Sequence, residues 1–269
     1  MRWLLAVLVA AAGVTLAFAG LTLLRQEEPE ELLPDLDQAL PTEVAIVQVG
    51  DTYRLVFASA VDNVGRGPLL IEGERADRFQ RVMEVRQLVR SSDGSMRERA
   101  VEGEIRYVRS ETHAHWHLLD FERYELREAE SGELVAPDAK TGFCLGDRYE
   151  TSDETELQGE PDEAVWTEEC GRRQPGLLDV SEGISPGYGD DYVPAREGQF
   201  LDVTSVPPGR YLLVHRANPD KALEESDHEN NAASLLIQLR RTTGVIPAVR
   251  VLARCPDSDA CSALADRQH

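Results

Sequence analysis

Lysine is almost absent from this chain: of the 28 basic residues only Lys140 and Lys221 are lysines, and all the others are arginines. Acidic residues number 49, so the formal net charge is −21. Such an excess of negative charge argues against nucleic acid as a partner, because the phosphate backbone would be repelled. It favours cationic ligands such as amines and basic proteins, although it also suits an exported protein that must stay soluble.

Long apolar runs are equally scarce, since the chain has one, over residues 3–24. This run is long enough to cross a bilayer as a helix. Residues 17–19 also form an Ala-Phe-Ala cleavage site, which is typical of a signal peptide. We therefore expect residues 1–25 to be an apolar helix that serves as a membrane anchor or a signal peptide, and residues 26–33 to be an acidic stalk. In both cases the rest of the chain is exported.

Cysteine is also sparse, with four residues in all. An exported protein meets an oxidising environment, which favours disulfides. Three pairings of four cysteines are possible, and proximity in the sequence favours Cys144 with Cys170 and Cys255 with Cys261. We expect both bonds to be structural staples.

Histidine is concentrated at one place, because three of the six histidines lie at alternating positions: His113, His115 and His117. In a β-strand, alternate side chains point to the same face. Three imidazoles on one face can bind copper, zinc, iron or nickel and leave a coordination position open. The spacing predicts a metal site, and these residues alone do not select the metal.

Short apolar runs with turn residues between them fill the chain from Val44 onward. This pattern predicts an all-β fold, a β-sandwich with long loops, because no amphipathic helix interrupts it. The acidic region 147–189 is expected to be a long functional loop. The expected strands are 53–58, 67–71, a hairpin of 81–89 with 101–108, 118–126, 200–203, 210–216 and 233–239.

Four segments of the chain form a recognisable set. They are the histidine segment 113–117 with its continuation to residue 126, and the segments 140–145, 183–192 and 225–231. Together they resemble the lysyl oxidase family in its bacterial form. They follow the family's order and spacing over about residues 33–239. The resemblance implies a catalytic β-sandwich over residues 34–241, and we expect residues 242–269 to be a tail with a local disulfide.

The resemblance implies copper bound by His113, His115 and His117, and a quinone cofactor built from the protein itself. In the family this cofactor is lysine tyrosylquinone, a cross-link between a lysine and an oxidised tyrosine. By motif position these residues are Lys140 and Tyr192, with Tyr188 as a nearby competing tyrosine. An arginine could not replace the lysine, because its guanidinium stays protonated.

The implied reaction is the oxidative deamination of primary amines, with peptidyl lysine or related amines as substrates. The products are an aldehyde, ammonia and hydrogen peroxide, and the oxidant is molecular oxygen. Such a reaction needs a base near the quinone. Asp190 and Asp191 are the nearest candidates in the sequence, although either one also suits a solvated turn.

A calcium site is a further implication of the resemblance. Hard oxygen ligands suit calcium, and a capped turn explains the same residues without a metal. The candidate ligands are Asp35, Leu36, Glu225, Asp227, Asn230 and Asn231.

Two other functions compete with the oxidase. A non-catalytic surface or adhesion module could keep the copper strand alone. A zinc hydrolase would use the three histidines and a bound water, but it leaves the lysine and tyrosine segments unexplained.

Overall fold

The computed structural model describes residues 28–109, 114–137, 142–151, 157–194 and 198–262. These residues form an all-β fold without helices, as the strand pattern predicts. The expected apolar helix over 1–25 lies outside the described residues. Within the described part of the chain, no helix is long and apolar enough to cross a membrane.

The first sheet carries the histidine strand at one edge. Its order is β12-β5-β6-β7-β8, with β1 paired to β6. The long hairpin of β6 and β7 confirms the hairpin expected around residues 81–108. The strands are β1 (Glu31–Leu32), β5 (Leu69–Glu74), β6 (Val82–Ser91), β7 (Met96–Arg109), β8 (Ala114–Leu118) and β12 (Asp179–Ile184).

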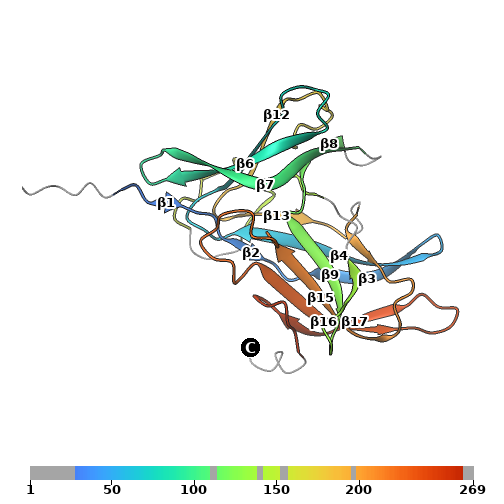
Figure 1. Cartoon of the computed structure of the whole chain (residues 1–269). Helices are drawn as coiled ribbons and strands as arrows, with labels where there is room; N and C mark the ends of the chain where they lie inside the picture. The colour runs from blue at the N-terminus through green and yellow to red at the C-terminus, as the bar shows by residue number, and fades with distance from the viewer. Residues whose placement is uncertain (1–27, 110–113, 138–141, 152–156, 195–197, 263–269) are drawn as a thin grey trace, which may run out of the picture.

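Two further sheets lie on the other side of the molecule, with β15 to β17 and β4 in the lower half of Figure 1. One has the order β10-β9-β15-β16-β17, and its strands are β9 (Glu122–Glu128), β10 (Leu134–Pro137), β15 (Gly209–Ala217), β16 (Ala232–Arg240) and β17 (Ala248–Cys255). The other has the order β11-β13-β4-β14, with β2 and β3 also on β4. Its strands are β2 (Leu36–Gln38), β3 (Thr42–Val49), β4 (Thr52–Asn63), β11 (Tyr149–Glu150), β13 (Tyr188–Tyr192) and β14 (Phe200–Asp202).

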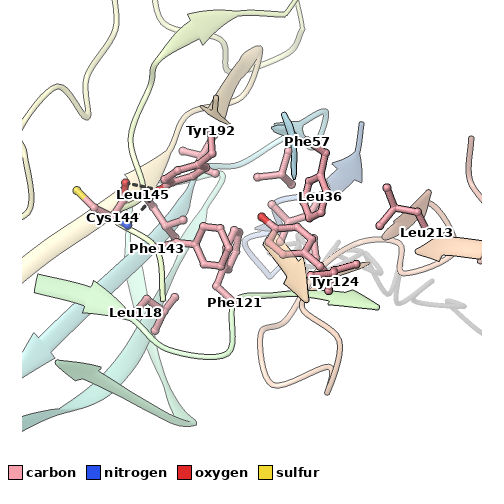
Figure 2. Packing of buried hydrophobic residues seen from close by; sticks show 14 of the residues in the cluster. Leu36, Phe57, Leu118, Phe121, Tyr124, Phe143, Cys144, Leu145, Tyr192 and Leu213 are labelled. Carbon is pink, nitrogen blue, oxygen red and sulfur yellow. Dashed lines mark hydrogen bonds between the residues drawn. The ribbon is translucent and has the colours of Figure 1, made fainter. Parts of the chain in front are cut away.

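The sheets of β4 and β15 share one hydrophobic core. Leu55 and Phe57 of β4 are fully buried in the same cluster as Leu213 of β15 and Ile237 of β16. Figure 2 shows Phe57 and Leu213 in this cluster together with Tyr124. Burying a large apolar side chain contributes roughly 1.5–3 kcal/mol, so this layer stabilises the pairing of the two sheets.

The histidine strand does not continue to residue 126 as expected. β8 ends at Leu118, a turn follows, and β9 begins at Glu122 in a different sheet. Asp120 in this turn has a φ of 57°, a left-handed conformation that aspartate tolerates better than most residues. The expected strand therefore splits, and the turn carries the chain from the first sheet to the second.

The segment expected to be a C-terminal tail contributes a strand. β17 pairs with β16 over Ala248 to Cys255. After β17 the chain turns back on itself through the Cys255–Cys261 disulfide. Both cysteines pack with Leu212 and Val214 in a second, smaller hydrophobic cluster. Both disulfide pairings expected from the sequence are confirmed.

Candidate active site

The histidine strand has the alternation expected of it. His115 and His117 lie on the same face of β8, with ring centroids 4.5 Å apart. Trp116 points to the opposite face, where it packs against Tyr107 with ring centroids 5.4 Å apart and lies under the guanidinium of Arg75. His113 lies outside the described residues. Among the residues that are described, no cluster of three histidine, cysteine or acidic side chains forms a metal site by itself.

The segment after Lys140 lies against the histidine strand. Lys140 itself is outside the described residues, but Gly142 is not. A β-carbon on Gly142 would come within 2.8 Å of the β-carbon of His117, so only glycine allows this close approach. One residue further on, Phe143 and Leu118 exchange two backbone hydrogen bonds of 2.9 and 2.8 Å.

The same segment reaches Tyr192 on its other side. Tyr192 lies on β13 opposite Ser59 of β4 and is 8 % exposed. Its hydroxyl accepts a hydrogen bond from the Cys144 amide at 3.2 Å, and the Cys144 carbonyl and the Asp190 carboxylate both lie 3.1 Å from it as acceptors. The Phe143 ring packs edge-on against the Tyr192 ring, as Figure 2 shows.

Tyr188 does not take part in this arrangement. Its hydroxyl points to the carbonyl of Pro161 at 3.5 Å, and in the described structure no hydrogen bond joins that hydroxyl to residues 142–145. Of the two tyrosines that compete in the sequence, Tyr192 is thus the one that meets the segment after the lysine.

The structure separates the two aspartates proposed as bases. Asp190 is 1 % exposed and forms an ion pair with Arg148 at 3.5 Å. Asp191 is exposed, because β13 turns it to the face opposite Tyr192. The structure therefore brings Asp190 to the tyrosine and leaves Asp191 in solvent.

Burial and charge keep the Tyr192 phenol protonated. Its pKa lies well above the usual value, chiefly because burial disfavours the phenolate, and also because of the negative charges of Asp190 and Glu122. Arg148 acts in the opposite direction, as the cation on the far side of Asp190.

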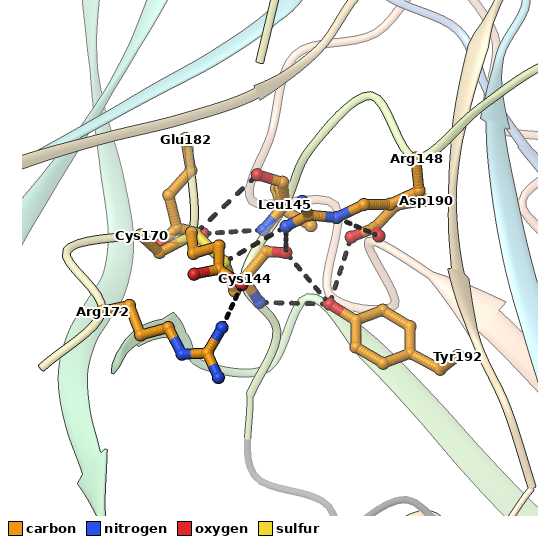
Figure 3. The surroundings of a disulfide bond; sticks show 9 residues. Cys144, Leu145, Arg148, Cys170, Arg172, Glu182, Asp190 and Tyr192 are labelled. Carbon is orange, nitrogen blue, oxygen red and sulfur yellow. Dashed lines mark hydrogen bonds and ion pairs between the residues drawn. A yellow bond between two sulfur atoms is a disulfide. The ribbon is translucent and has the colours of Figure 1, made fainter. Parts of the chain in front are cut away.

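The Cys144–Cys170 disulfide joins the three motif segments. Cys144 holds the tyrosine hydroxyl through its amide, and Cys170 accepts a hydrogen bond of 2.9 Å from the amide of Trp116 in the histidine strand. Figure 3 shows the disulfide with Tyr192, Asp190 and Arg148 around it. This staple therefore fixes the tyrosine relative to the histidines.

Sequence reasoning missed three charged groups near the tyrosine: the buried Glu122 and Glu182, and Arg148, which reaches in from the surface. Glu122 accepts a hydrogen bond from the Tyr124 hydroxyl, and Glu182 accepts one from the Leu145 amide at 3.1 Å. Strand periodicity was the signal that could have found the two glutamates. Glu122 alternates with the buried Tyr124 and Leu126, and Glu182 alternates with the buried Val180 and Ile184.

The residues of the candidate calcium site come together from both ends of the domain. Glu225 accepts hydrogen bonds from the Leu36 amide at 2.9 Å and from Asn231 at 2.8 Å. Asn230 donates to Asp35 at 2.7 Å. The side-chain oxygens of Asn230 and Asn231 are buried and have no hydrogen-bond partner in the described structure. Asp227 lies in the same turn but is exposed and caps the amide of Glu229.

Fold and site thus define an all-β protein in which a histidine strand, a lysine-bearing segment and a buried tyrosine converge. The chain belongs to the lysyl oxidase family, because the model of that family matches residues 72–247. It is 33 % identical to lysyl oxidase homolog 1 of Homo sapiens over 120 residues, 44 % of this chain and 18 % of that protein.

Two further relatives match this chain with similar identity and coverage. Identity to the protein-lysine 6-oxidase of Rattus norvegicus is 32 % over 44 % of this chain and 25 % of the relative. For the protein-lysine 6-oxidase of Sus scrofa it is 32 % over 44 % of this chain and 41 % of the relative. The chain therefore spans less than half the length of each of these relatives.

Proposed function

We propose that this protein is a copper- and quinone-dependent amine oxidase that converts primary amines, peptidyl lysine among them, to aldehydes. The observation that carries the proposal is the course of residues 142–145. This segment lies against His117 at one end and holds the Tyr192 hydroxyl at the other. The activity that names the protein-lysine 6-oxidases among its relatives agrees with this reading.

His113, His115 and His117 would hold the copper. The two described rings share a face and lie close enough to bind one ion, and imidazole is a ligand that copper accepts readily. His113 would extend the same face by one step of the strand alternation. The residues present therefore fit the metal.

Lys140 and Tyr192 would form the quinone cofactor. Lys140 precedes Gly142 by two residues, so covalent geometry keeps their α-carbons within about 7 Å of each other. Three residues after Lys140 the Phe143 ring packs against the Tyr192 ring, so the segment that follows the lysine reaches the tyrosine. When formed, the cofactor supplies an electrophilic carbonyl that accepts the electrons of the amine.

The protein's own groups would control the protons. Asp190 accepts from the Tyr192 hydroxyl, and Arg148 compensates its charge. The Cys144 amide fixes the tyrosine oxygen and stabilises negative charge that develops there. Asp190 is thus our candidate for the base, and its buried position excludes competing water.

Asp35, Leu36, Glu225, Asp227, Asn230 and Asn231 are proposed as a calcium site. The unpartnered amide oxygens of Asn230 and Asn231 fit a hard cation. Calcium there would fasten the start of the domain to the loop before β16, and its role would be structural.

We propose an exported location, with residues 1–25 as anchor or signal peptide. Two disulfides agree with an oxidising compartment. The partners are then an amine-bearing substrate, such as a lysine-containing protein, and molecular oxygen.

The test is an intact mass and a tryptic map of the exported domain purified with copper under air. We expect a cross-linked peptide joining Lys140 to Tyr192, together with quinone absorbance. Lys140→Arg should abolish both, and Lys221→Arg is the matched control, because it removes the only other lysine. If both peptides stay unmodified at full copper occupancy, the oxidase proposal fails and the non-catalytic copper-binding module takes its place.

A further inference from the structure

Glu182 is a buried carboxyl group that the proposed reaction does not use. It lies on β12, is 1 % exposed and accepts a hydrogen bond from the Leu145 amide at 3.1 Å through one oxygen. Its other oxygen is buried and has no hydrogen-bond partner in the described part of the chain. Burying a carboxyl in this way is costly, so a purely structural acceptor would be served better by glutamine.

The partner of Glu182 is next in sequence to the residue that holds the tyrosine. Leu145 follows Cys144, whose amide donates to the Tyr192 oxygen. Figure 3 shows Glu182, Leu145, Cys144 and Tyr192 in this sequence, with Arg148 and Asp190 beside them. Fixing the Leu145 amide therefore fixes the plane of the peptide group between Cys144 and Leu145. That peptide group includes the Cys144 carbonyl, which accepts from the Tyr192 hydroxyl at 3.1 Å.

We propose that Glu182 is a positioning residue for Tyr192: by holding the Leu145 amide it keeps the Cys144 carbonyl, in the same peptide group, aimed at the tyrosine hydroxyl. This inference deepens the proposed oxidase function and rests on it for the role of Tyr192. Glu182 acts through the backbone and need not touch the substrate or the cofactor.

The surrounding charges favour the neutral form of Glu182. The charged groups that act on it are Asp190 on β13 and Arg148 after the lysine-bearing segment, and the Tyr192 phenol also lies in range. Arg148 is already paired with Asp190. Burial first, and the charge of Asp190 after it, raise the pKa of Glu182 well above its usual value. Asp190 is the carboxyl group at the tyrosine hydroxyl, and Arg148 is its ion-pair partner.

Ionisation of Glu182, above its raised pKa, would place a second negative charge near Asp190. Because one guanidinium cannot compensate two buried carboxylates, we expect the peptide group to shift and the hold on Tyr192 to weaken. The NMR signal of Tyr192 should therefore change at the pH where Glu182 ionises.

The experiment compares Glu182→Gln with Glu182→Leu. Glutamine keeps an acceptor for the Leu145 amide and cannot ionise, whereas leucine removes the acceptor. Glu125→Gln is the matched control, because Glu125 is also buried but pairs with Arg127 and Arg216 on β9 and β15. The readouts are amine oxidation and the NMR signal of Tyr192 in metal-free protein with 13C-labelled tyrosine, assigned by its loss in Tyr192→Phe.

We expect Glu182→Gln to stay within about twofold of the wild type at neutral pH and to lose the inflection of the Tyr192 signal that follows the ionisation of Glu182. Glu182→Leu should lower kcat/KM by roughly 10- to 100-fold, as misplacing a reacting group does, and should shift the Tyr192 signal. The control should leave both readouts unchanged.

A Tyr192 signal that is the same in wild type, Glu182→Gln and Glu182→Leu at every pH would overturn the positioning role. Should the leucine variant not fold, the pH dependence of the Tyr192 signal in Glu182→Gln decides alone: an inflection that persists there below pH 10, where the phenol itself stays protonated, contradicts the inference. The signal is measured without copper, so this result does not depend on the oxidase activity. If wild-type protein lacks the cross-linked peptide of Lys140 and Tyr192 but its Tyr192 signal still follows the titration of Glu182, the proposed function is refuted instead.

Discussion

The Tyr192 hydroxyl has three polar neighbours but one proton. It accepts from the Cys144 amide and can donate to the Cys144 carbonyl or to Asp190. The guanidinium of Arg148 also lies 3.3 Å from that carbonyl, so the carbonyl has another donor when the proton goes to Asp190. A single phenolic oxygen thus links the lysine-bearing segment to the buried ion pair.

Tyr192→Phe removes these hydrogen bonds while keeping the ring that packs on Phe143. We expect no quinone absorbance, no cross-link to Lys140 and no amine oxidation. Stability should fall by roughly 1–3 kcal/mol, because Asp190 and the Cys144 amide lose a buried partner. Denaturant unfolding and a tryptic map measure both effects. Tyr188→Phe is the control and should keep the cofactor; loss of the cofactor there instead would return Tyr188 to the candidates.

His215 is a second residue whose surroundings change its pKa and, through it, the stability of the protein. It is fully buried, stacks with Phe57 and Tyr124, and lies 3.3 Å from the Ser59 hydroxyl through Nδ1. Burial lowers the pKa of its imidazole to about 3. The folded protein therefore keeps this side chain neutral at a pH where the unfolded chain binds a proton.

Because the folded-state pKa of His215 is lowered, the free energy of unfolding decreases as the pH is lowered from about 6.5 to about 3. In that window only the unfolded state gains the proton. His215 alone should cost about 1.4 kcal/mol for each pH unit in that window. His215→Phe should remove this slope, although it leaves Ser59 with one partner fewer. Urea unfolding from pH 7 to pH 4 measures the effect. Equal slopes in the two proteins would mean that His215 is protonated in the fold.

At the scale of elements, two disulfides differ in what they join. Cys144–Cys170 closes 26 residues and connects the tyrosine segment to the histidine strand, whereas Cys255–Cys261 closes 6 residues after β17. The first is a tie between sheets, and the second is local to the chain end.

Replacing Cys144 and Cys170 by serine should cost roughly 3–4 kcal/mol, against roughly 2–2.5 kcal/mol for the Cys255 and Cys261 pair, by loop-closure entropy. The larger difference should be in chemistry. We expect the first pair of substitutions to prevent cofactor formation and the second to leave it intact. Thermal unfolding and quinone absorbance measure these outcomes, and equal cofactor yields in both variants would show that the tie between sheets is dispensable.

At the scale of the whole molecule, the cluster around Glu225 connects the first strands to the last sheet. The start of β2 meets the loop before β16 there. The Leu36 amide donates a hydrogen bond to Glu225, and the Asn230 side chain donates one to Asp35. Burial raises the pKa of the Glu225 carboxyl. The folded protein then holds this proton more tightly than the unfolded chain does.

Metal-free protein should therefore lose stability as pH rises above about 4.5, the ordinary value of the carboxyl, through the folded pKa. Calcium should reverse this loss by binding the ionised form, and it stabilises by about 2.7 kcal/mol at one hundred times its dissociation constant. Thermal unfolding with calcium and with a chelator measures the shift, and Glu225→Gln should abolish it. An equal calcium effect in that variant would place the ion elsewhere.

The sequence by itself determined what local patterns can carry. Alternation predicted the hairpin of β6 and β7 and the shared face of His115 and His117, because strand periodicity needs no tertiary partner. Proximity along the chain predicted both disulfides. The motif segments identified the family, whose model matches residues 72–247.

Only the tertiary structure decided which of these groups meet. Asp190 and Asp191 are adjacent and chemically alike, yet the pairing of β13 with β4 buries the first and exposes the second. Glu122 and Glu182 are charged residue types on the apolar faces of their strands, and the packing of separate sheets buries them near Tyr192. Burial depends on what covers a strand, and that is set by residues distant in the sequence.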